Sequence, residues 1–354
     1  MVKHNNAFGQ SCLDLSGDFF KHVDTTSVAK NMEAIRVALN DGNLNWLGGS
    51  YGTQIGAQYA ELYPNNIRAM VLDGDVGHSP SDVYLHAAES STYENSPWSL
   101  LRLGRDKTPI SAPGCLTTAD ISSAGTCFAN VTGEDIRFNV QGNSYLTFKN
   151  GTSFSPCGWL KLGIALNDTF NGHATPLSSA MANREKNSTV WPGLAVACLD
   201  WNHNTATFAQ NKYKQQLESA IAPHTKGASQ MYQYQTQCIG WPAPVVNQTA
   251  MKLAPPILMV NSNHDPKSSY VWAQSLRTQV PSAVLVARSS DGHTSFGLGG
   301  QASAVVDADL VNRTLPTPNF VVNVVIFVLC LALGFNRLAL FGVFSAQDSV
   351  PSTE

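Results

Sequence analysis

The stretch Asn45-Trp46-Leu47-Gly48-Gly49-Ser50-Tyr51-Gly52-Thr53 decides the fold class of this chain. It contains the pattern Gly-x-Ser-x-Gly, in which a serine occupies a sharp turn between a strand and a helix. Glycines at the two flanking positions, Gly48 and Gly52, avoid the clashes that larger side chains would make in so tight a turn. The turn raises the serine hydroxyl above the sheet, so Ser50 is a candidate nucleophile.

The residues around this turn match a unit of strand, turn, helix and strand. Residues 43–47 are short and apolar, as in a buried strand, and residues 54–62 carry apolar side chains at helical spacing before Pro64 ends the helix. Residues 69–72 predict the next buried strand. The order predicts a βαβ unit with Ser50 at its first turn. The alternative is a glycine-rich turn that carries a serine by chance.

Length and charge are those of an ordinary globular protein. It has 354 residues, enough for one large domain or for a core domain with an inserted second one. Its net charge is −3 and its charged fraction is 13%. No basic stripe indicates nucleic-acid binding, and no acidic tail indicates disorder. The sequence also predicts no cofactor.

The cysteines and glycosylation sequons favour export. No two cysteines have the spacing of a CxxC metal or redox pair. The seven cysteines are Cys12, Cys115, Cys127, Cys157, Cys198, Cys238 and Cys330. The six sequons begin at Asn130, Asn150, Asn167, Asn187, Asn247 and Asn312. Five of these sequons fall within residues 130–247, which predicts a surface-rich segment and an extracellular glycoprotein; the alternative is a cytosolic protein with inert sequons.

The first residues give a different signal. Residues 1–6 are polar, and no apolar stretch of the kind found in a secretory leader follows them. A composition typical of secreted proteins without such a leader predicts that this sequence is part of a longer protein.

The strand and helix patterns predict a core that is interrupted by an insertion. Residues 25–40 form an amphipathic helix pattern that Asp24, Thr25 or Thr26 could cap. The βα rhythm stops near His78 and returns at residue 255. The predicted parts are 1–77, the first part of the core; 78–246, a largely helical cap; 247–318, the second part of the core; and 319–354, an apolar tail.

The second part of the core supplies the partners that a serine nucleophile needs. Asp265 follows a predicted strand at 257–261, and His293 follows another at 283–287, with a helix at 269–280 between them. Functional side chains gather beyond the carboxyl ends of parallel strands. The chain order Ser, Asp, His is that of the α/β-hydrolase triad. Histidine would take the serine proton, and the aspartate would orient the imidazole.

The acid of this triad has alternatives. Asp73 and Asp75 follow the second predicted strand and could serve instead. Asp265 could also do no more than cap a turn before Pro266. The pattern alone leaves this choice open.

The other histidines are expected to have no catalytic role. His293 is the candidate base, although it could be a surface loop residue. His264 is adjacent to Asp265, so its side chain is expected to point elsewhere and to be structural. His203, near Asp200, has no partner at metal-ligand spacing, so no metal site is predicted.

These motifs together resemble the tripeptidyl aminopeptidase and proline iminopeptidase group of α/β hydrolases, the S33 serine peptidases. The resemblance covers residues 10–318 and is weakest in the cap. The segments that carry it are 12–18, 44–53, 71–74, 238–242, 256–266 and 291–296. It implies an α/β-hydrolase fold with Ser50 as nucleophile, Asp265 as acid and His293 as base. It also implies a disulfide between Cys198 and Cys238.

A second cysteine pair rests on proximity alone. Cys115 and Cys127 are close in the sequence and are a further candidate disulfide.

The resemblance also implies a feature that does not precede Ser50 here. Members of the group have upstream strands and a His-Gly-Gly-type loop that donates one oxyanion-hole N–H. The other donor would be the backbone N–H of Tyr51, so the second donor is missing from this chain. We expect a sheet truncated at its N-terminal side, with residues 43–47 at an open edge. Loss of one oxyanion donor costs about a hundredfold to a thousandfold in rate.

The last residues do not fit the group. An apolar run starts at Val321 and reaches the length of a membrane span only if it continues to Phe344. It then includes Arg337, a costly residue inside a bilayer. The tail is therefore a candidate membrane contact, with membrane anchoring as the alternative location, or a non-native extension.

The sequence thus predicts a serine exopeptidase that releases short peptides or amino acids from peptide N-termini. Its substrate would be a short peptide, and the cap would restrict access to the serine. The alternatives are a carboxylester hydrolase on the same triad and a catalytically impaired fragment without the oxyanion loop.

Overall fold

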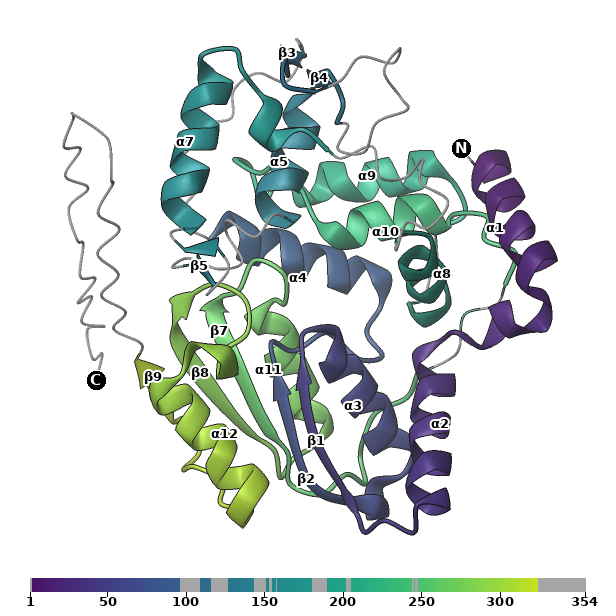
Figure 1. Ribbon diagram of the computed structural model, residues 1–354, viewed down its shortest axis with the longest axis vertical. Coiled ribbons are helices and arrows are strands. Elements are labelled where there is room, and N and C mark those ends of the chain that lie inside the picture. The colour runs from purple at the N-terminus through teal and green to yellow at the C-terminus, as the bar shows by residue number, and fades with distance from the viewer. Residues whose placement is uncertain are drawn as a thin grey trace.

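The computed structural model describes residues 2–95, 109–115, 127–142, 151–152, 155–156, 158–179, 190–201, 205–243, 245 and 248–323. A central sheet has helices on both faces, and a largely helical cap lies over one end of it (Figure 1). The core elements are α2 Thr25–Ala38, β1 Leu44–Gly49, α3 Tyr51–Leu62, β2 Ile67–Asp73, β7 Leu258–His264, α11 Tyr270–Gln279, β8 Val284–Asp291, α12 Gly300–Asn312 and β9 Val321–Asn323.

The cap is the segment between β2 and β7. Its described elements are α4 Asp82–Glu94, β3 Ile110–Ser111, β4 Asn130–Val131, α5 Gly133–Gly142, β5 Gly151–Thr152, β6 Ser155–Pro156, α7 Gly158–Phe170, α8 Val190–Asp200, α9 Phe208–Glu218 and α10 Gln230–Cys238. Short 3-10 helices lie at Gly17–His22, Pro64–Asn66, Thr175–Leu177 and Phe296–Leu298.

The sheet is parallel throughout its five described strands, in the order β1-β2-β7-β8-β9. Successive side chains face opposite layers. Met70 and Leu72 of β2 pack in a cluster with residues of α2, α3 and α11, whereas Val71 packs in a second cluster with residues of α12. Because helices cover both faces, the central strands are continuous apolar runs, which is why they are recognisable in the sequence.

Strand β1 lies at the edge of this sheet among the described residues, as the sequence led us to expect for residues 43–47. Its side chains alternate between partly buried and exposed. Trp46 packs against the cluster under α3, whereas Asn45 and Leu47 are exposed. An edge strand presents unpaired backbone N–H and C=O groups to its surroundings.

Asp24 caps α2, and this selects one of the three candidate caps. Its Oδ1 accepts a hydrogen bond of 2.8 Å from Ser27 N, and its Oδ2 accepts one of 2.7 Å from Ser27 Oγ. The side chain thereby satisfies an N–H group that has no partner within the helix.

The N-terminal helix α1, Val2–Ser16, was not expected from the sequence, which is polar there. Tertiary contacts explain it. The buried Asn5 side chain donates to Thr236 O at 2.9 Å and to Ile239 O at 3.1 Å, at the end of α10. Side chain–backbone bonds of this kind come from residues distant in sequence, so no local pattern reports them.

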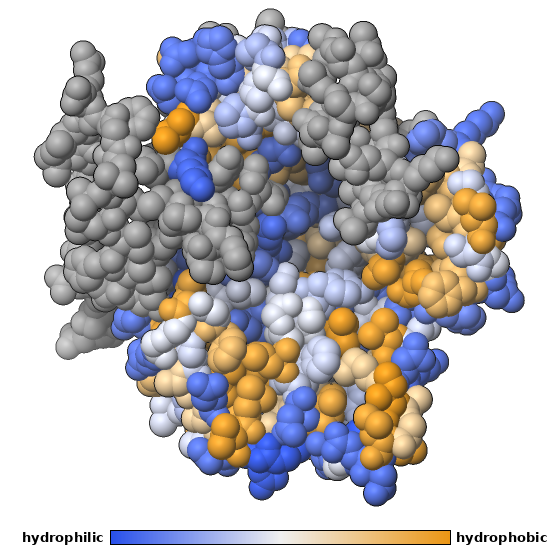
Figure 2. All heavy atoms as spheres, viewed as in Figure 1, coloured by the Kyte–Doolittle hydropathy of each residue, from blue (hydrophilic) through white to orange (hydrophobic). Residues whose placement is uncertain are grey.

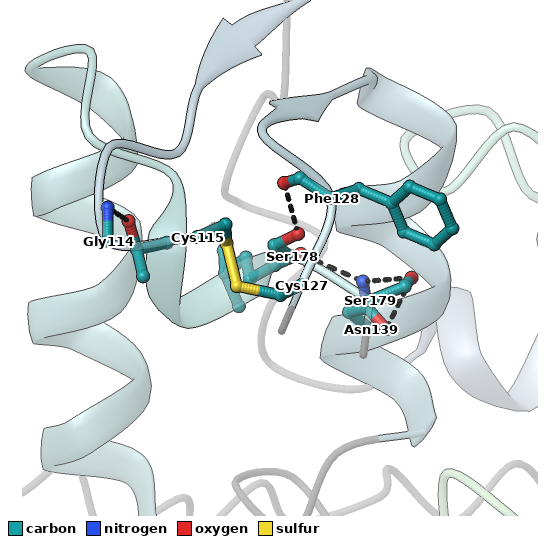
Figure 3. Close-up of a disulfide and its surroundings, with 9 residues drawn as sticks. Gly114, Cys115, Cys127, Phe128, Asn139, Ser178 and Ser179 are labelled. Atoms are coloured by element: carbon teal, nitrogen blue, oxygen red, sulfur yellow. Dashed lines mark hydrogen bonds between the residues drawn. A yellow bond between two sulfur atoms is a disulfide. The ribbon is translucent and has the colours of Figure 1, made fainter. Parts of the chain in front are cut away.

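Two disulfides cross-link the cap. Cys198 of α8 pairs with Cys238 of α10, the pair that the resemblance implied, and Cys115 pairs with Cys127 beside β3 and β4 (Figure 3). Next to the second disulfide, Ser178 Oγ donates to Phe128 O at 2.7 Å. The Cys12 thiol is free. Cys157 and Cys330 lie outside the described residues.

The apolar tail begins later than residue 319. Val321–Asn323 form β9, which pairs in parallel with β8, and Val322 is fully buried in the cluster under α12. Residues 321–323 therefore belong to the core sheet, because pairing with β8 satisfies their backbone. Residues 324–354, including most of the candidate membrane segment, lie outside the described part. Within that part, no helix combines the length and apolarity that crossing a bilayer requires.

Three of the six candidate glycosylation sites can be examined. Asn130, Asn167 and Asn312 are all exposed, so their side-chain amides are accessible. Asn150, Asn187 and Asn247 lie outside the described residues.

Candidate active site

Ser50 stands between the end of β1 and the start of α3 in a strained backbone conformation. Its φ is 55° and its ψ is −124°, and its N–H donates to Asp73 O at 2.9 Å on the neighbouring strand. A positive φ at a residue with a side chain costs free energy and is concentrated at functional sites. The tight turn places Ser50 at the carboxyl end of the sheet.

The two glycines of the motif are not equivalent. A Cβ atom at Gly48 would lie 2.3 Å from Gly52 O, so no side chain fits there. A Cβ atom at Gly52 would meet nothing within 4 Å. The expectation that both glycines relieve a clash is therefore wrong for Gly52, because its missing side chain would point into open space.

His293 and Asp265 lie together in the next loops along this edge. His293 Nδ1 is 2.9 Å from both Asp265 Oδ1 and Asp265 Oδ2. Ser268 Oγ lies 2.8 Å from Asp265 Oδ2, to which it donates, and 3.1 Å from His293 Nδ1. Asp265 is fully buried and His293 is 8% exposed. The pair thus has the arrangement that orients an imidazole.

The environment of Asp265 keeps its carboxylate ionised. Burial opposes the charged form, but the adjacent His293 and backbone N–H bonds from Ser268 and Lys267 outweigh it, so the pKa of Asp265 lies below its ordinary value. These N–H groups lie 2.8 and 2.9 Å from Asp265 Oδ1. The acid is therefore a charged acceptor for His293.

The imidazole ring lies beside the turn that carries Ser50. A Cβ atom on Gly74 would be 3.3 Å from His293 Cε1, and Gly74 directly follows Asp73, whose carbonyl accepts the Ser50 N–H. His293 Nε2 is buried and has no hydrogen-bond partner, and no hydrogen bond joins the described side chains of Ser50 and His293. The ring nitrogen opposite Asp265 is thus free to accept a proton.

The other two candidate acids do not bond His293. Asp73 Oδ2 accepts backbone N–H bonds of 2.8 Å each from Ser295 and Phe296, just beyond the histidine. Asp75 is fully buried, and neither of its carboxylate oxygens has a hydrogen-bond partner. Burial raises the pKa of Asp75 well above its ordinary value, which favours the neutral acid.

Arg288 organises the histidine loop, and the sequence analysis did not identify it. Its guanidinium donates to the carbonyls of Asp291, Gly292 and Thr294 at 2.8, 2.7 and 3.0 Å. Its Nε also donates to Ser295 Oγ at 3.0 Å, and the side chain is fully buried. The available signal was an arginine directly after the apolar strand predicted at 283–287, because an arginine is rarely buried unless its charge is paired.

His264 was expected to be structural, and His203 was expected to bind no metal. His264 ends β7, where its backbone pairs in register with Asp291, and its Nδ1 is buried without a partner. His203 lies outside the described residues. Across the residues that the structure describes, no group of three or more His, Cys, Asp or Glu side chains could hold a metal ion.

Tyr51 contributes two different groups at the site. Its backbone N–H begins α3 directly after Ser50, where an oxyanion donor is expected. Its phenol hydrogen-bonds to Asp200, the last residue of α8. The first turn of α3 is therefore attached to the cap.

The surface of the molecule is hollowed between the cap and the core (Figure 2). The face seen in Figure 2 is hollowed there, and hydrophilic side chains gather in the hollow. A separate cavity of about 560 Å³ lies between α11, β8 and β9, and none of its lining residues belongs to the candidate triad.

Comparison with known proteins finds two matched families. Residues 8–96 match the family described as alpha/beta hydrolase fold, and residues 223–321 match the family described as TAP-like protein. The first match contains Ser50 and the second contains Asp265 and His293.

Individual relatives match over different lengths. The serine protease Hip1 of Mycobacterium tuberculosis (strain H37Rv) is 42% identical over 86 residues, 24% of this chain and 16% of the relative. A tripeptidyl aminopeptidase of Streptomyces lividans is 38% identical over 80 residues, 23% of this chain and 15% of the relative. The putative hydrolase YuaR of Escherichia coli (strain K12) is 24% identical over 336 residues, 86% of this chain and 63% of the relative.

Each alignment thus spans less than two thirds of the relative's own length. The two family matches leave residues 97–222, the middle of the cap, unmatched, and contain β1, β2, β7 and β8 with the serine turn and the loops of Asp265 and His293. The fold is thus that of an α/β hydrolase, and the chain is similar to the TAP-like group in the segment that this family's model matches.

Proposed function

We propose that this chain is a serine exopeptidase that releases short peptides or amino acids from the free N-termini of peptides through an acyl-enzyme on Ser50. The observation that carries the proposal is a strained serine turn with a buried imidazole beside it. That imidazole has Asp265 on Nδ1 and no partner on Nε2. This is the arrangement that a serine nucleophile and its base require.

The reaction would proceed in two halves. In the first, His293 Nε2 takes the proton of Ser50 Oγ while the oxygen attacks the peptide carbonyl carbon. His293 then gives that proton to the leaving amine as the C–N bond breaks. In the second half, His293 takes a proton from water, which attacks the acyl carbon, and returns a proton to Ser50 as the ester breaks.

Two groups stabilise the charges that develop. The ionised Asp265 compensates the positive charge of the His293 imidazolium through the hydrogen bond that it accepts from Nδ1. The backbone N–H of Tyr51, at the N-terminus of α3, would donate to the oxyanion, where the helix dipole also favours negative charge. A single backbone donor would give a slower enzyme than a complete pair.

The relatives favour a peptide substrate. Two of them are named serine protease and tripeptidyl aminopeptidase, and one of the matched families is described as TAP-like. The cap, which lies over the carboxyl end of the sheet, would limit the length of peptide that reaches Ser50. An ester substrate remains the alternative for the same triad.

A labelling and turnover experiment tests the proposal. A fluorophosphonate probe should label the wild-type chain at Ser50 and leave Ser50→Ala unlabelled. Turnover of tripeptidyl and aminoacyl chromogenic amides is then compared with turnover of short acyl esters. Preference for the amides supports the exopeptidase; ester turnover alone would replace it with the carboxylester hydrolase. Labelling without any turnover would indicate the impaired fragment.

We also propose that the protein works outside the cell. Two disulfides and the exposed sequons at Asn130, Asn167 and Asn312 fit an oxidising compartment. Free thiols at Cys198 and Cys238 in protein isolated from its source would contradict this. Recovery from a washed membrane fraction would instead favour the anchored alternative.

A further inference from the structure

Three helix ends meet on the cap side of Ser50. Helix α2 begins at Thr25, α3 begins at Tyr51 and α8 ends at Asp200. Asp200 Oδ1 accepts the Thr25 N–H at 2.7 Å, and Asp200 Oδ2 accepts Thr25 Oγ1 at 2.6 Å. The Tyr51 hydroxyl also donates to Asp200 Oδ2. We call these three residues the Asp200 junction.

Two residues of the junction are buried, and Tyr51 is partly exposed. Thr25 is 1% exposed and Asp200 is 3% exposed. Burial raises the pKa of Asp200, and hydrogen bonds from Thr25 and Tyr51 oppose that rise. Asp200 also raises the pKa of Tyr51, after burial, so the phenol stays protonated and remains a donor. Leaving a buried carboxylate without one of its donors costs free energy, so the hydrogen bonds from Thr25 and Tyr51 to Asp200 resist breaking.

The junction reaches the reacting groups through one residue. Tyr51 follows Ser50 directly, and its backbone N–H is the candidate oxyanion donor. Its ring also meets Trp201 edge-on at 6.2 Å between centroids, within a cluster of cap and core side chains. The side chain thus fixes the residue whose N–H must point at the oxyanion.

The junction also connects to the cross-linked part of the cap. Cys198, two residues before Asp200, is in the disulfide with Cys238 of α10. Gln248 Nε2 donates to Asp200 O at 3.1 Å, from the segment that returns to the core. A shift of α8 would therefore displace the Tyr51 side chain in the first turn of α3.

We propose that Asp200 is a positioning residue for the oxyanion site. By holding the Tyr51 hydroxyl, together with Thr25, it fixes the orientation of the Tyr51 N–H and couples the cap to the nucleophile turn. The inference rests on the proposed function, because the proposed function assigns the Tyr51 N–H as the oxyanion donor.

The same helix supplies a matched control. Tyr59, eight residues later on α3, is fully buried, and its hydroxyl donates to Glu33 Oε2 on α2 at 2.6 Å. Tyr51→Phe and Tyr59→Phe therefore each remove one phenol–carboxylate bond from α3. Only the first bond lies beside Ser50.

The first test is kinetic. Tyr51→Phe should lower kcat and the fluorophosphonate labelling rate by about 10- to 100-fold, because small misplacements of catalytic groups cost this much, with little change in KM. Asp200→Asn should give a loss of the same kind. Tyr59→Phe should keep the wild-type kcat, although its melting temperature should fall by about as much as that of Tyr51→Phe. Equal losses of kcat in the two tyrosine variants would overturn the positioning role.

The second test does not depend on turnover. Amide hydrogen exchange should accelerate in Tyr51→Phe at Ser50 and Thr53, whose N–H groups donate to Asp73 O and Ser50 O, and should remain at the wild-type rate there in Tyr59→Phe. Unchanged exchange in Tyr51→Phe would refute the junction as an anchor. If the wild-type chain does not label, the proposed function fails, and this exchange measurement alone decides whether Asp200 holds the turn.

Discussion

His293 Nδ1 lies 2.9 Å from both carboxylate oxygens of Asp265, and this contact is buried. The acid accepts from Nδ1–H, so the lone pair of the neutral ring is on Nε2. This fixes the tautomer that can take a proton from Ser50. The carboxylate is itself held by the Ser268 and Lys267 N–H groups, so the orientation of the ring is determined by the loop after β7.

We expect Asp265→Asn to lower kcat by about 10⁴-fold, because the amide can donate to Nδ1 and stabilise the wrong tautomer. Steady-state kinetics on the preferred chromogenic substrate measure this. Asp309→Asn, a change at a buried carboxyl on α12, is the control and should keep kcat. A kcat of Asp265→Asn near that of the wild type would return Asp73 or Asp75 as candidate acids.

The two glycines of the serine motif should respond differently to alanine. Gly48→Ala places a methyl group 2.3 Å from Gly52 O, so the turn must open, and we expect activity to fall at least about a hundredfold. Gly52→Ala places its methyl group in open space and should keep most of the activity. Fluorophosphonate labelling of both variants checks this. A labelled, folded Gly48→Ala would show that the backbone at this turn adapts.

The elements that the sequence predicted share a simple physical cause. The strands at 69–72, 257–261 and 283–287 lie within β2, β7 and β8 almost completely, because a strand buried on both faces is a continuous apolar run. The loops with Asp265 and His293 could be located for the same reason: they directly follow such runs.

The missed features depend on contacts between distant segments. Helix α1 has no clear apolar stripe and is positioned by Asn5 bonds to carbonyls more than 200 residues away. The link between Tyr51 and Asp200 spans 149 residues. Arg288 and Asp73 hold the histidine loop by hydrogen bonds to its backbone. Every residue has the same backbone groups, so the sequence does not indicate which of them are bonded.

Arg288 should be required for the position of His293. In Arg288→Lys the charge remains, but an ammonium cannot reproduce the fork of bonds to the carbonyls of Asp291, Gly292 and Thr294. We expect kcat to fall about a hundredfold, with a lower melting temperature. Arg36→Lys, which alters a partly exposed ion pair with Glu33, is the control. Wild-type kcat in Arg288→Lys would mean that Asp73 alone holds the loop.

The Cys198–Cys238 disulfide should stabilise the cap. It joins residues 40 apart, and in the chain-entropy description such a loop contributes about 4 kcal/mol. Replacing both cysteines by alanine should lower the free energy of unfolding by about this amount in urea titrations. Cys12→Ser, which removes the free thiol, should leave it unchanged. An equal stability of the double variant and the wild type would show that the bond adds nothing to folding.

Glu89 is a buried carboxyl on α4 whose ionisation should oppose folding. It accepts hydrogen bonds from Ser229 Oγ at 2.5 Å and from Met231 N at 3.0 Å, at the start of α10. Burial raises the pKa of Glu89 from 4.5 to about 7, hydrogen bonds from Ser229 and from the backbone of Met231 and Gln230 only partly offset the rise, and the nearby Glu218 adds to it. The folded chain therefore keeps a proton that the unfolded chain releases above pH 4.5.

Folding stability should fall as the pH rises from about 4.5 to about 7 through this group, since there the folded state binds more protons, and the fall should end above the folded pKa. The full effect corresponds to about 3 kcal/mol. Urea unfolding at pH 5, 6, 7 and 8 should show Glu89→Gln gaining stability relative to the wild type over this range.

Glu33→Gln is the control, because the Arg36 guanidinium lowers the pKa of Glu33 to about 2. That carboxylate is ionised in both states above pH 5, so its loss should lower stability by the same amount at every pH. Parallel curves for the wild type and Glu89→Gln would contradict the assignment.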